Sequence, residues 1–219
     1  MGGGYGIYGK IPGAGDFIRR GLSPEFISAW DGWMQRFLLT GREALGGRWQ
    51  DAYFSAPIWR FALSPRIAGA AGVVGIVMPS VDRVGRQFPL CLAAELEAQA
   101  WPAYLAASDA FETLESAALD SLDDGGTPES LAAALAPLSA PVAAPVAHPF
   151  ALGRSVALAT PAPLPAGAAT ATLAPAGSLW ISSHEGQHRM MTNADLPSTA
   201  EEATAFFDGA APAWTTGGA

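Results

Sequence analysis

A histidine pair near the C-terminal end has the spacing of a known zinc motif. The segment reads His184-Glu185-Gly-Gln-His188, which fits the pattern H-E-x-x-H. On a helix, this spacing places both imidazoles on one face, where they hold zinc while the glutamate acts as general base. Here a glycine stands at the centre of the motif, and strand-forming residues flank it on both sides, which favours a hairpin. A small zinc-dependent hydrolase therefore stands as the alternative function, and we assign no metal site.

A glycine-rich segment near the N-terminus resembles a phosphate-binding loop. Residues Gly4–Lys10 fit G-x4-G-K, but Ile11 stands where such a loop needs Ser or Thr to bind magnesium. No strand precedes the segment, and its own alternation of small and large side chains predicts a strand. We therefore predict no nucleotide site and no cofactor.

Polar residues concentrate in the segment 78–90, between two predicted strands. Together with residues from the N-terminal turn and the first helix they form a candidate partner-binding set, since Trp and Arg are common at interface hot spots. The set is Asp16, Arg19, Arg20, Trp30, Asp31, Ser80, Asp82, Arg83 and Arg86. Two interpretations stay open: an exposed surface that binds a partner, or an internal network of Arg–Asp pairs that ties the 78–90 loop to the N-terminal turn.

The composition indicates a packed domain. Of the 219 residues, 50% are hydrophobic and 15% are charged, the opposite of a disordered chain. The single cysteine, Cys91, excludes an intramolecular disulfide framework and is predicted to be buried in a strand. The net charge of −8 argues against a general nucleic-acid binder. Residues 1–90 hold 10 basic and 6 acidic side chains, whereas residues 91–219 hold 2 basic and 14 acidic ones.

Two long uncharged stretches, 130–153 and 155–184, are interrupted by prolines and contain no run of about 20 strongly apolar residues. The N-terminus lacks the basic region and apolar run of a signal peptide. These features predict a soluble, cytoplasmic protein without membrane insertion.

Hydrophobic periodicity predicts the elements that must position the polar set. The predicted strands cover residues 4–9, 57–63, 72–78, 87–93, 178–183 and 188–192. The predicted helices cover residues 24–40, 101–122, 128–138 and 199–208. Three strands in succession indicate antiparallel pairing. We therefore predict an α/β (α+β) sandwich: a mixed, mostly antiparallel sheet of about five to six strands with helices on both faces.

Capping residues set the predicted helix ends. Ser23 is a suitable N-cap for the first long helix, and Gly41 is predicted to end that helix. Ser198 and Glu201 are predicted to form a capping box for the last helix. We predict a single domain over 1–219, with a less regular Pro/Ala-rich stretch at 139–177 that holds one short strand near 155–158.

Several segments together resemble the TagF (ImpM) family, accessory proteins of bacterial type VI secretion systems. The resemblance covers most of the chain and thins over 120–177. The matching segments are Tyr8–Leu22, Trp30–Gln35, Ser55–Phe61, Met78–Leu90, Ser178–Trp180 and Phe206–Gly209.

The resemblance implies a function and a fold. It implies a non-enzymatic, cytoplasmic regulator that holds secretion off after translation. Its partner is expected to be the system's forkhead-associated scaffold or another apparatus component, in a circuit with a Ser/Thr kinase and a phosphatase. The resemblance brings no catalytic residues and no cofactor, and it implies a longin-like sandwich.

Overall fold

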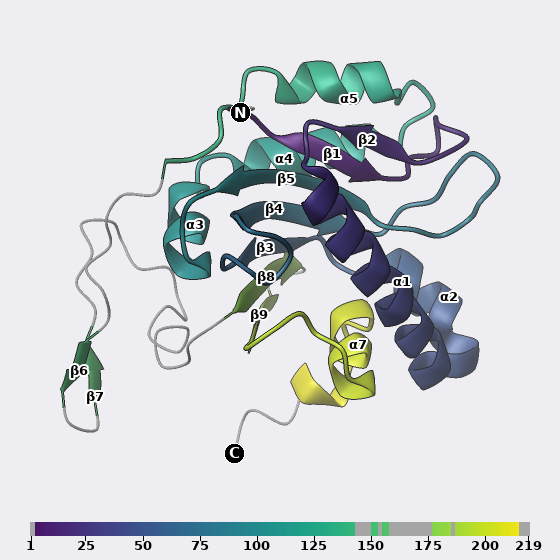
Figure 1. Ribbon diagram of the computed structural model, residues 1–219. Helices are drawn as coiled ribbons and strands as arrows, with labels where there is room; N and C mark the ends of the chain where they lie inside the picture. The colour runs from purple at the N-terminus through teal and green to yellow at the C-terminus, as the bar shows by residue number, and fades with distance from the viewer. Residues whose placement is uncertain (1–2, 143–149, 153–154, 158–176, 185–186, 215–219) are drawn as a thin grey trace.

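A seven-stranded antiparallel sheet forms the centre of the computed structural model, in the order β2-β1-β5-β4-β3-β8-β9 (Figure 1). The structure describes residues 3–142, 150–152, 155–157, 177–184 and 187–214. The strands of the sheet are β1 (Gly6–Gly9), β2 (Ile18–Arg20), β3 (Trp59–Leu63), β4 (Gly72–Met78), β5 (Leu90–Leu96), β8 (Ser178–His184) and β9 (Gln187–Asn193). A separate two-stranded sheet consists of β6 (Phe150–Leu152) and β7 (Ser155–Ala157). The strand predicted near 155–158 corresponds to β7, whereas β6 was not predicted. Most of the stretch 139–177, including residue 158, lies outside the described residues.

Helices cover both faces of the sheet, which confirms the predicted sandwich (Figure 1). One face carries α1 (Pro24–Leu45), α2 (Trp49–Ser55) and α7 (Ala200–Phe207), with the short turns η1 (Gly46–Arg48) and η2 (Pro212–Trp214). The other face carries α3 (Ala100–Ala106), α4 (Phe111–Asp120) and α5 (Pro128–Leu135). Alternate residues of a strand point to opposite faces, so Val73 and Val77 of β4 join one core while Val74 and Ile76 join the other.

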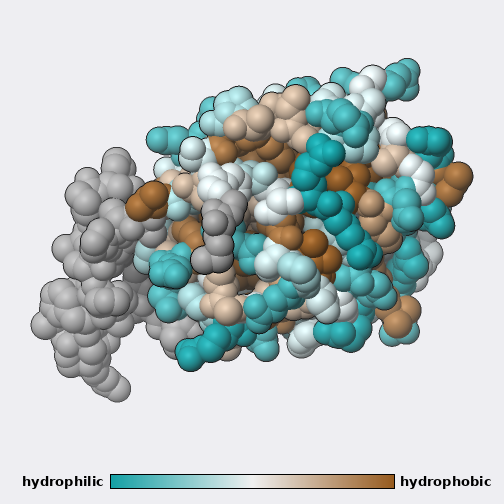
Figure 2. Space-filling view, turned by 45° about the horizontal axis from the view of Figure 1, so that its top comes forward, coloured by the Kyte–Doolittle hydropathy of each residue, from teal (hydrophilic) through white to brown (hydrophobic). Residues whose placement is uncertain are grey.

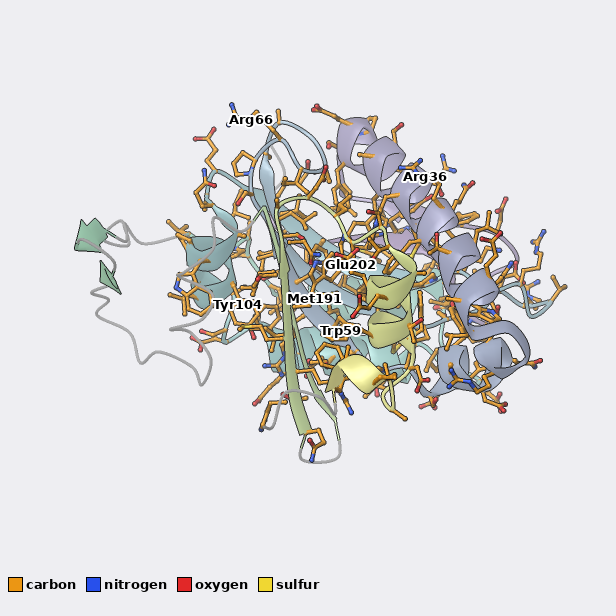
Figure 3. All side chains as sticks on the ribbon, turned by 90° about the horizontal axis from the view of Figure 1, so that it is seen from below. Arg36, Trp59, Arg66, Tyr104, Met191 and Glu202 are labelled. Carbon is orange, nitrogen blue, oxygen red and sulfur yellow. The ribbon has the colours of Figure 1, made fainter. Side chains whose placement is uncertain are left out.

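The core under α1 and α7 is rich in aromatic rings. Trp59 donates its indole N–H to the carbonyl of Phe206 at 3.0 Å, and the two rings stack. Figure 3 shows Trp59 beside α7, together with Glu202 of that helix and Met191 of β9. The Glu202 carboxylate accepts a hydrogen bond from the side-chain amide of Asn193, which ties α7 to β9. The last helix is thereby held against the edge of the sheet.

Two predictions about the helices are wrong. The capping box of α7 lies one residue further on, where Thr199 caps the backbone N–H of Glu202 and the Glu202 carboxylate accepts from the N–H of Thr199. The predicted helix over 101–122 is two helices, because the chain turns at residues 107–110 between α3 and α4.

Among the described residues, no helix combines the length and apolarity that a bilayer crossing requires.

The prediction that Gly41 ends the first helix is also wrong. The helix α1 continues to Leu45 and ends at Gly46, whose φ of 53° only glycine adopts at little cost. Gly41 instead lies where α2 and α7 approach α1. A Cβ atom there would lie 2.7 Å from a ring carbon of Trp49 and 3.0 Å from one of Phe207. The glycine therefore serves close helix packing.

A Gly41→Ala variant is expected to be destabilised by about 1 kcal/mol. Overpacking a core costs about 1–3 kcal/mol, and the better helix propensity of alanine returns only about 1 kcal/mol. Gly32→Ala on the same helix is the matched control, because its Cβ would meet only the flexible end of Arg36 at 3.4 Å. Urea denaturation should therefore show a lower midpoint for Gly41→Ala and an equal or higher one for Gly32→Ala. An equal rise of the urea midpoint in both variants would contradict the packing role of Gly41.

Candidate partner-binding surface

Asp82 is the centre of a buried charge network at the β4–β5 loop. Its carboxylate accepts from the ammonium of Lys10 at 3.0 Å and from the guanidinium of Arg86 at 2.6 Å. The backbone N–H groups of Val84 and Arg86 donate to the other carboxylate oxygen at 3.1 and 2.9 Å. The Asp82 side chain is fully buried, so the internal-network interpretation holds for this residue. Lys10 is buried in the same pair, which leaves no free ammonium for a phosphate.

The environment of Asp82 favours its charged form. Burial alone would raise the pKa of the carboxyl group, but the hydrogen bonds from Arg86, Lys10 and Val84 outweigh it and hold the pKa well below its usual range. The carboxylate is therefore ionised at neutral pH and organises the loop around it.

The difference in unfolding free energy between the natural protein and Asp82→Asn is expected to shrink in acid. The pKa of Asp82 is lower in the folded state than the value of about 3.9 in an unfolded chain. Its contribution is then complete above about pH 5 and is lost as the pH falls toward the folded-state pKa. Urea denaturation of both proteins over a pH series measures this difference. A difference that stays constant from neutral pH into acid would contradict the assignment.

Backbone carbonyls of the N-terminal turn hold the two loop arginines in place. The Arg83 guanidinium donates to the carbonyl of Gly13 at 3.0 Å, and that of Arg86 donates to the carbonyl of Gly15 at 3.1 Å. The backbone N–H of Arg83 also donates to the carbonyl of Ala14 at 3.0 Å. The Arg86 side chain nevertheless stays 62% exposed. The loop and the turn thus form one fixed surface with two accessible arginines.

An aromatic cluster joins this surface to β1 and α1. The ring of Phe17 packs against those of Tyr8 and Phe88, with ring centres 5.7 and 4.8 Å away, and the Tyr8 and Phe88 rings also contact each other. The hydroxyl of Tyr8 donates to the carboxylate of Asp31 on α1, and the guanidinium of Arg19 lies 5.9 Å from the ring centre of Tyr8. Asp31 and Arg19 therefore both contact the same tyrosine, Tyr8.

The remaining exposed residues of the candidate partner-binding set lie on the edge strand β2 and in the N-terminal turn. Arg20 ends β2, with its guanidinium 3.9 Å from the Glu129 carboxylate of α5. The exposed Asp16 accepts a hydrogen bond from the backbone N–H of Phe17. Of the predicted set, Asp16, Arg83 and Arg86 thus lie on the turn and on the loop bonded to it, whereas Arg19 and the half-buried Asp31 lie at Tyr8.

Three members of the predicted set are not accessible to a partner. Trp30 is 0% exposed, and its ring packs against those of Phe61 and Trp33, so the prediction that it anchors an interface is wrong. Ser80 is buried, and its backbone carbonyl and N–H both bond the hydroxyl of Tyr53. Asp82 is buried as described above. These three residues are buried beneath the candidate surface and do not form part of it.

The histidine motif lies on a hairpin and not on a helix. His184 ends β8, His188 lies in β9, and the two strands pair so that Ser183 is opposite His188. This arrangement lacks the helical face that the zinc chemistry requires. Glu185 lies outside the described residues. Within the part of the chain that the structure describes, no three His, Cys, Asp or Glu side chains gather as a metal site would need.

Sequence reasoning missed one positioning residue, Gln87. Its side-chain oxygen accepts from the indole N–H of Trp49 at 2.8 Å and from the guanidinium of Arg42 at 3.1 Å. This amide joins the β4–β5 loop to both α1 and α2. An isolated, uncharged glutamine in a loop gives no pattern by which its role could have been found.

Comparisons with known proteins identify relatives of the chain. A family model described as the TagF N-terminal domain, type VI secretion system-associated, matches residues 6–138. The crystal structure of PA0076 from Pseudomonas aeruginosa PAO1 is similar over 94% of each chain, with 35% sequence identity and a TM-score of 0.73. No curated protein matches the chain.

Proposed function

We propose a regulatory role for this chain, which belongs to the type VI secretion-associated TagF family. In this proposal it is a non-enzymatic protein of the cytoplasm that represses secretion after translation. It acts by binding the forkhead-associated scaffold of the system, or another apparatus component, and it is linked functionally to a Ser/Thr kinase and a phosphatase. The proposed role involves neither binding to nucleic acid nor insertion into a membrane.

The extent of the family match supports the proposal most strongly. The matched range, residues 6–138, contains the N-terminal turn, α1 and the β4–β5 loop, which together build the arginine-bearing surface. That surface is preorganised, because Arg83 and Arg86 are already bonded to carbonyls of the turn. A preorganised surface loses little conformational entropy when it binds, which favours partner recognition.

Occupancy is the mechanism that these features support. A partner bound across the loop and the turn would have its own contact surface covered, and assembly of the apparatus would be blocked while the complex lasts. The arginines suit carboxylates of the partner, since the planar guanidinium donates two parallel hydrogen bonds. Repression then depends on the concentrations of the two proteins and on their affinity, without any chemical step.

A secretion assay tests the proposal. Overproduction of the chain is expected to lower the amount of a type VI substrate in the culture medium, and deletion of its gene is expected to raise it. Transcripts and total protein levels of the apparatus should stay unchanged in both strains, because the proposed action follows translation. Unchanged secretion in both strains, or a matching change in transcripts, would contradict the proposal.

A further inference from the structure

A hollow lies beside the arginine-bearing surface, where α1, α2 and the β4–β5 loop meet. Its walls include Arg42, Trp49, Phe54, Arg86 and Gln87. At this end of the molecule, on the right in Figure 2, hydrophobic residues stand among hydrophilic ones. Phe54 is 57% exposed, so its ring is accessible to a partner.

The walls of the hollow are rigid. The Gln87 amide holds both Trp49 and Arg42, and the Arg42 guanidinium lies 5.6 Å from the ring centre of Trp49. The hydroxyl of Tyr53, next to Phe54, is bonded to the backbone of Ser80. The helix α2 and the loop are therefore fixed to each other, and the hollow exists before any partner arrives.

A second depression continues on the other side of Phe54, toward α4. It is a groove of about 390 Å³ lined by Phe54, Met78, Leu119 and Leu122 together with the Arg60–Glu115 ion pair. Leu119 and Leu122 are 52% and 40% exposed. Phe54 lines both depressions, so they form one surface: a hollow with two arginines on one side of the ring and, on the other, a groove whose apolar side chains surround an ion pair.

The charge around the hollow is positive on a chain that is otherwise acidic. Within the described residues, Arg42 and Arg83 have no carboxylate within 4.0 Å, and the Asp82 carboxylate is shared between two cations. By contrast, the segment 100–138, which forms α3 to α5, contains seven acidic and no basic residues. Acidic groups of a partner are therefore attracted to the arginines of the hollow and repelled by the layer of α3 to α5.

We propose that the surface centred on Phe54 binds an acidic segment of a protein partner. Carboxylates of the segment lie over Arg42 and Arg86, and an adjacent apolar side chain packs against Phe54 and enters the groove at Leu119 and Leu122. Acidic residues on α4 exclude the reverse orientation. This inference rests on the proposed function and specifies the partner's chemistry: a cluster of Asp or Glu next to a large apolar residue.

Binding to the purified forkhead-associated scaffold tests the surface. Phe54→Asp and Arg42→Glu are each expected to weaken binding at least about tenfold, as hot-spot residues do. Arg36→Glu is the matched control and should change the affinity less than about twofold, because Arg36 is exposed elsewhere on α1 (Figure 3) and has no ion pair within the described residues. Circular dichroism and thermal melting should show that all variants fold, since the replaced side chains are exposed.

A photo-crosslinker at position 54 identifies the occupant. The expected product joins the chain to a scaffold peptide that carries Asp or Glu beside an apolar residue. A crosslink to a second copy or to the chain itself would overturn the inference, as would full binding by both Phe54→Asp and Arg42→Glu. In that last case the regulatory proposal stands. If the natural protein binds neither the scaffold nor any other apparatus component, both proposals fail.

Discussion

Replacing Trp30 with alanine is expected to lower the free energy of unfolding by about 3–5 kcal/mol, the usual cost of deleting a buried tryptophan side chain. The indole is 0% exposed and lies between rings of the sheet and of α1, with ring centres of Phe61 and Trp33 at 4.8 and 4.9 Å. The deletion would leave a large cavity in the core under α1. Guanidinium denaturation followed by circular dichroism measures the loss independently of tryptophan fluorescence.

Phe54→Ala is the control for the Trp30 variant, because it also removes a large aromatic ring but from an exposed site. Its stability should change by less than about 1 kcal/mol. If Trp30→Ala were as stable as Phe54→Ala and instead lost partner binding, the assignment of Trp30 to the core would be wrong. The residue would then belong to the interface.

The double variant Arg83→Ala/Arg86→Ala is expected to weaken binding to the forkhead-associated scaffold by at least about tenfold, or about 1.4 kcal/mol. Both guanidinium groups are accessible and are held at fixed positions by the N-terminal turn. The fold should persist, because Asp82 keeps its bond to Lys10 and the backbone N–H groups that donate to it. Isothermal titration calorimetry measures the affinity.

The matched control for the double variant is Arg36→Ala/Arg66→Ala. Both of these arginines are exposed and form no ion pair within the described residues, and Arg66 lies in the β3–β4 loop, at the opposite end of the strands from the β4–β5 loop. The control should bind as the natural chain does. If both double variants bound with equal affinity, the two loop arginines would not belong to the interface. The regulatory proposal would then lack its proposed contact surface.

The long amphipathic and β-branched segments were predictable because their periodicity is strong. The start of α1 follows from Ser23, whose hydroxyl accepts the backbone N–H of Phe26 as an N-cap should. The strand β4 was predicted with its observed bounds, Gly72–Met78. Short elements escaped prediction: β2 spans three residues and α2 spans seven, too few for a period to show. Their positions are set by tertiary contacts.

The candidate surface was predictable only in part, since sequence patterns do not distinguish a buried charge from an exposed one. Asp82 and Arg86 stand four residues apart in one polar loop, yet the first is buried and the second is exposed. The difference arises from Lys10, which is 72 residues away in the chain and reaches Asp82 only after β1 has paired with β5. Gln87, by contrast, has no signature in the sequence at all. Long-range pairing therefore decides which polar residues face a partner.

Affinity capture of the tagged chain from its own cells, followed by quantitative mass spectrometry, tests the central claim most directly. The captured material is expected to contain a type VI secretion component, with the forkhead-associated scaffold as the foremost candidate. That component should be lost when Arg83→Ala/Arg86→Ala is used as bait and kept with Arg36→Ala/Arg66→Ala. If every bait captured the type VI component, the regulatory proposal would stand, but the contact surface would lie elsewhere on the chain. The absence of any type VI component from the natural bait would contradict the account.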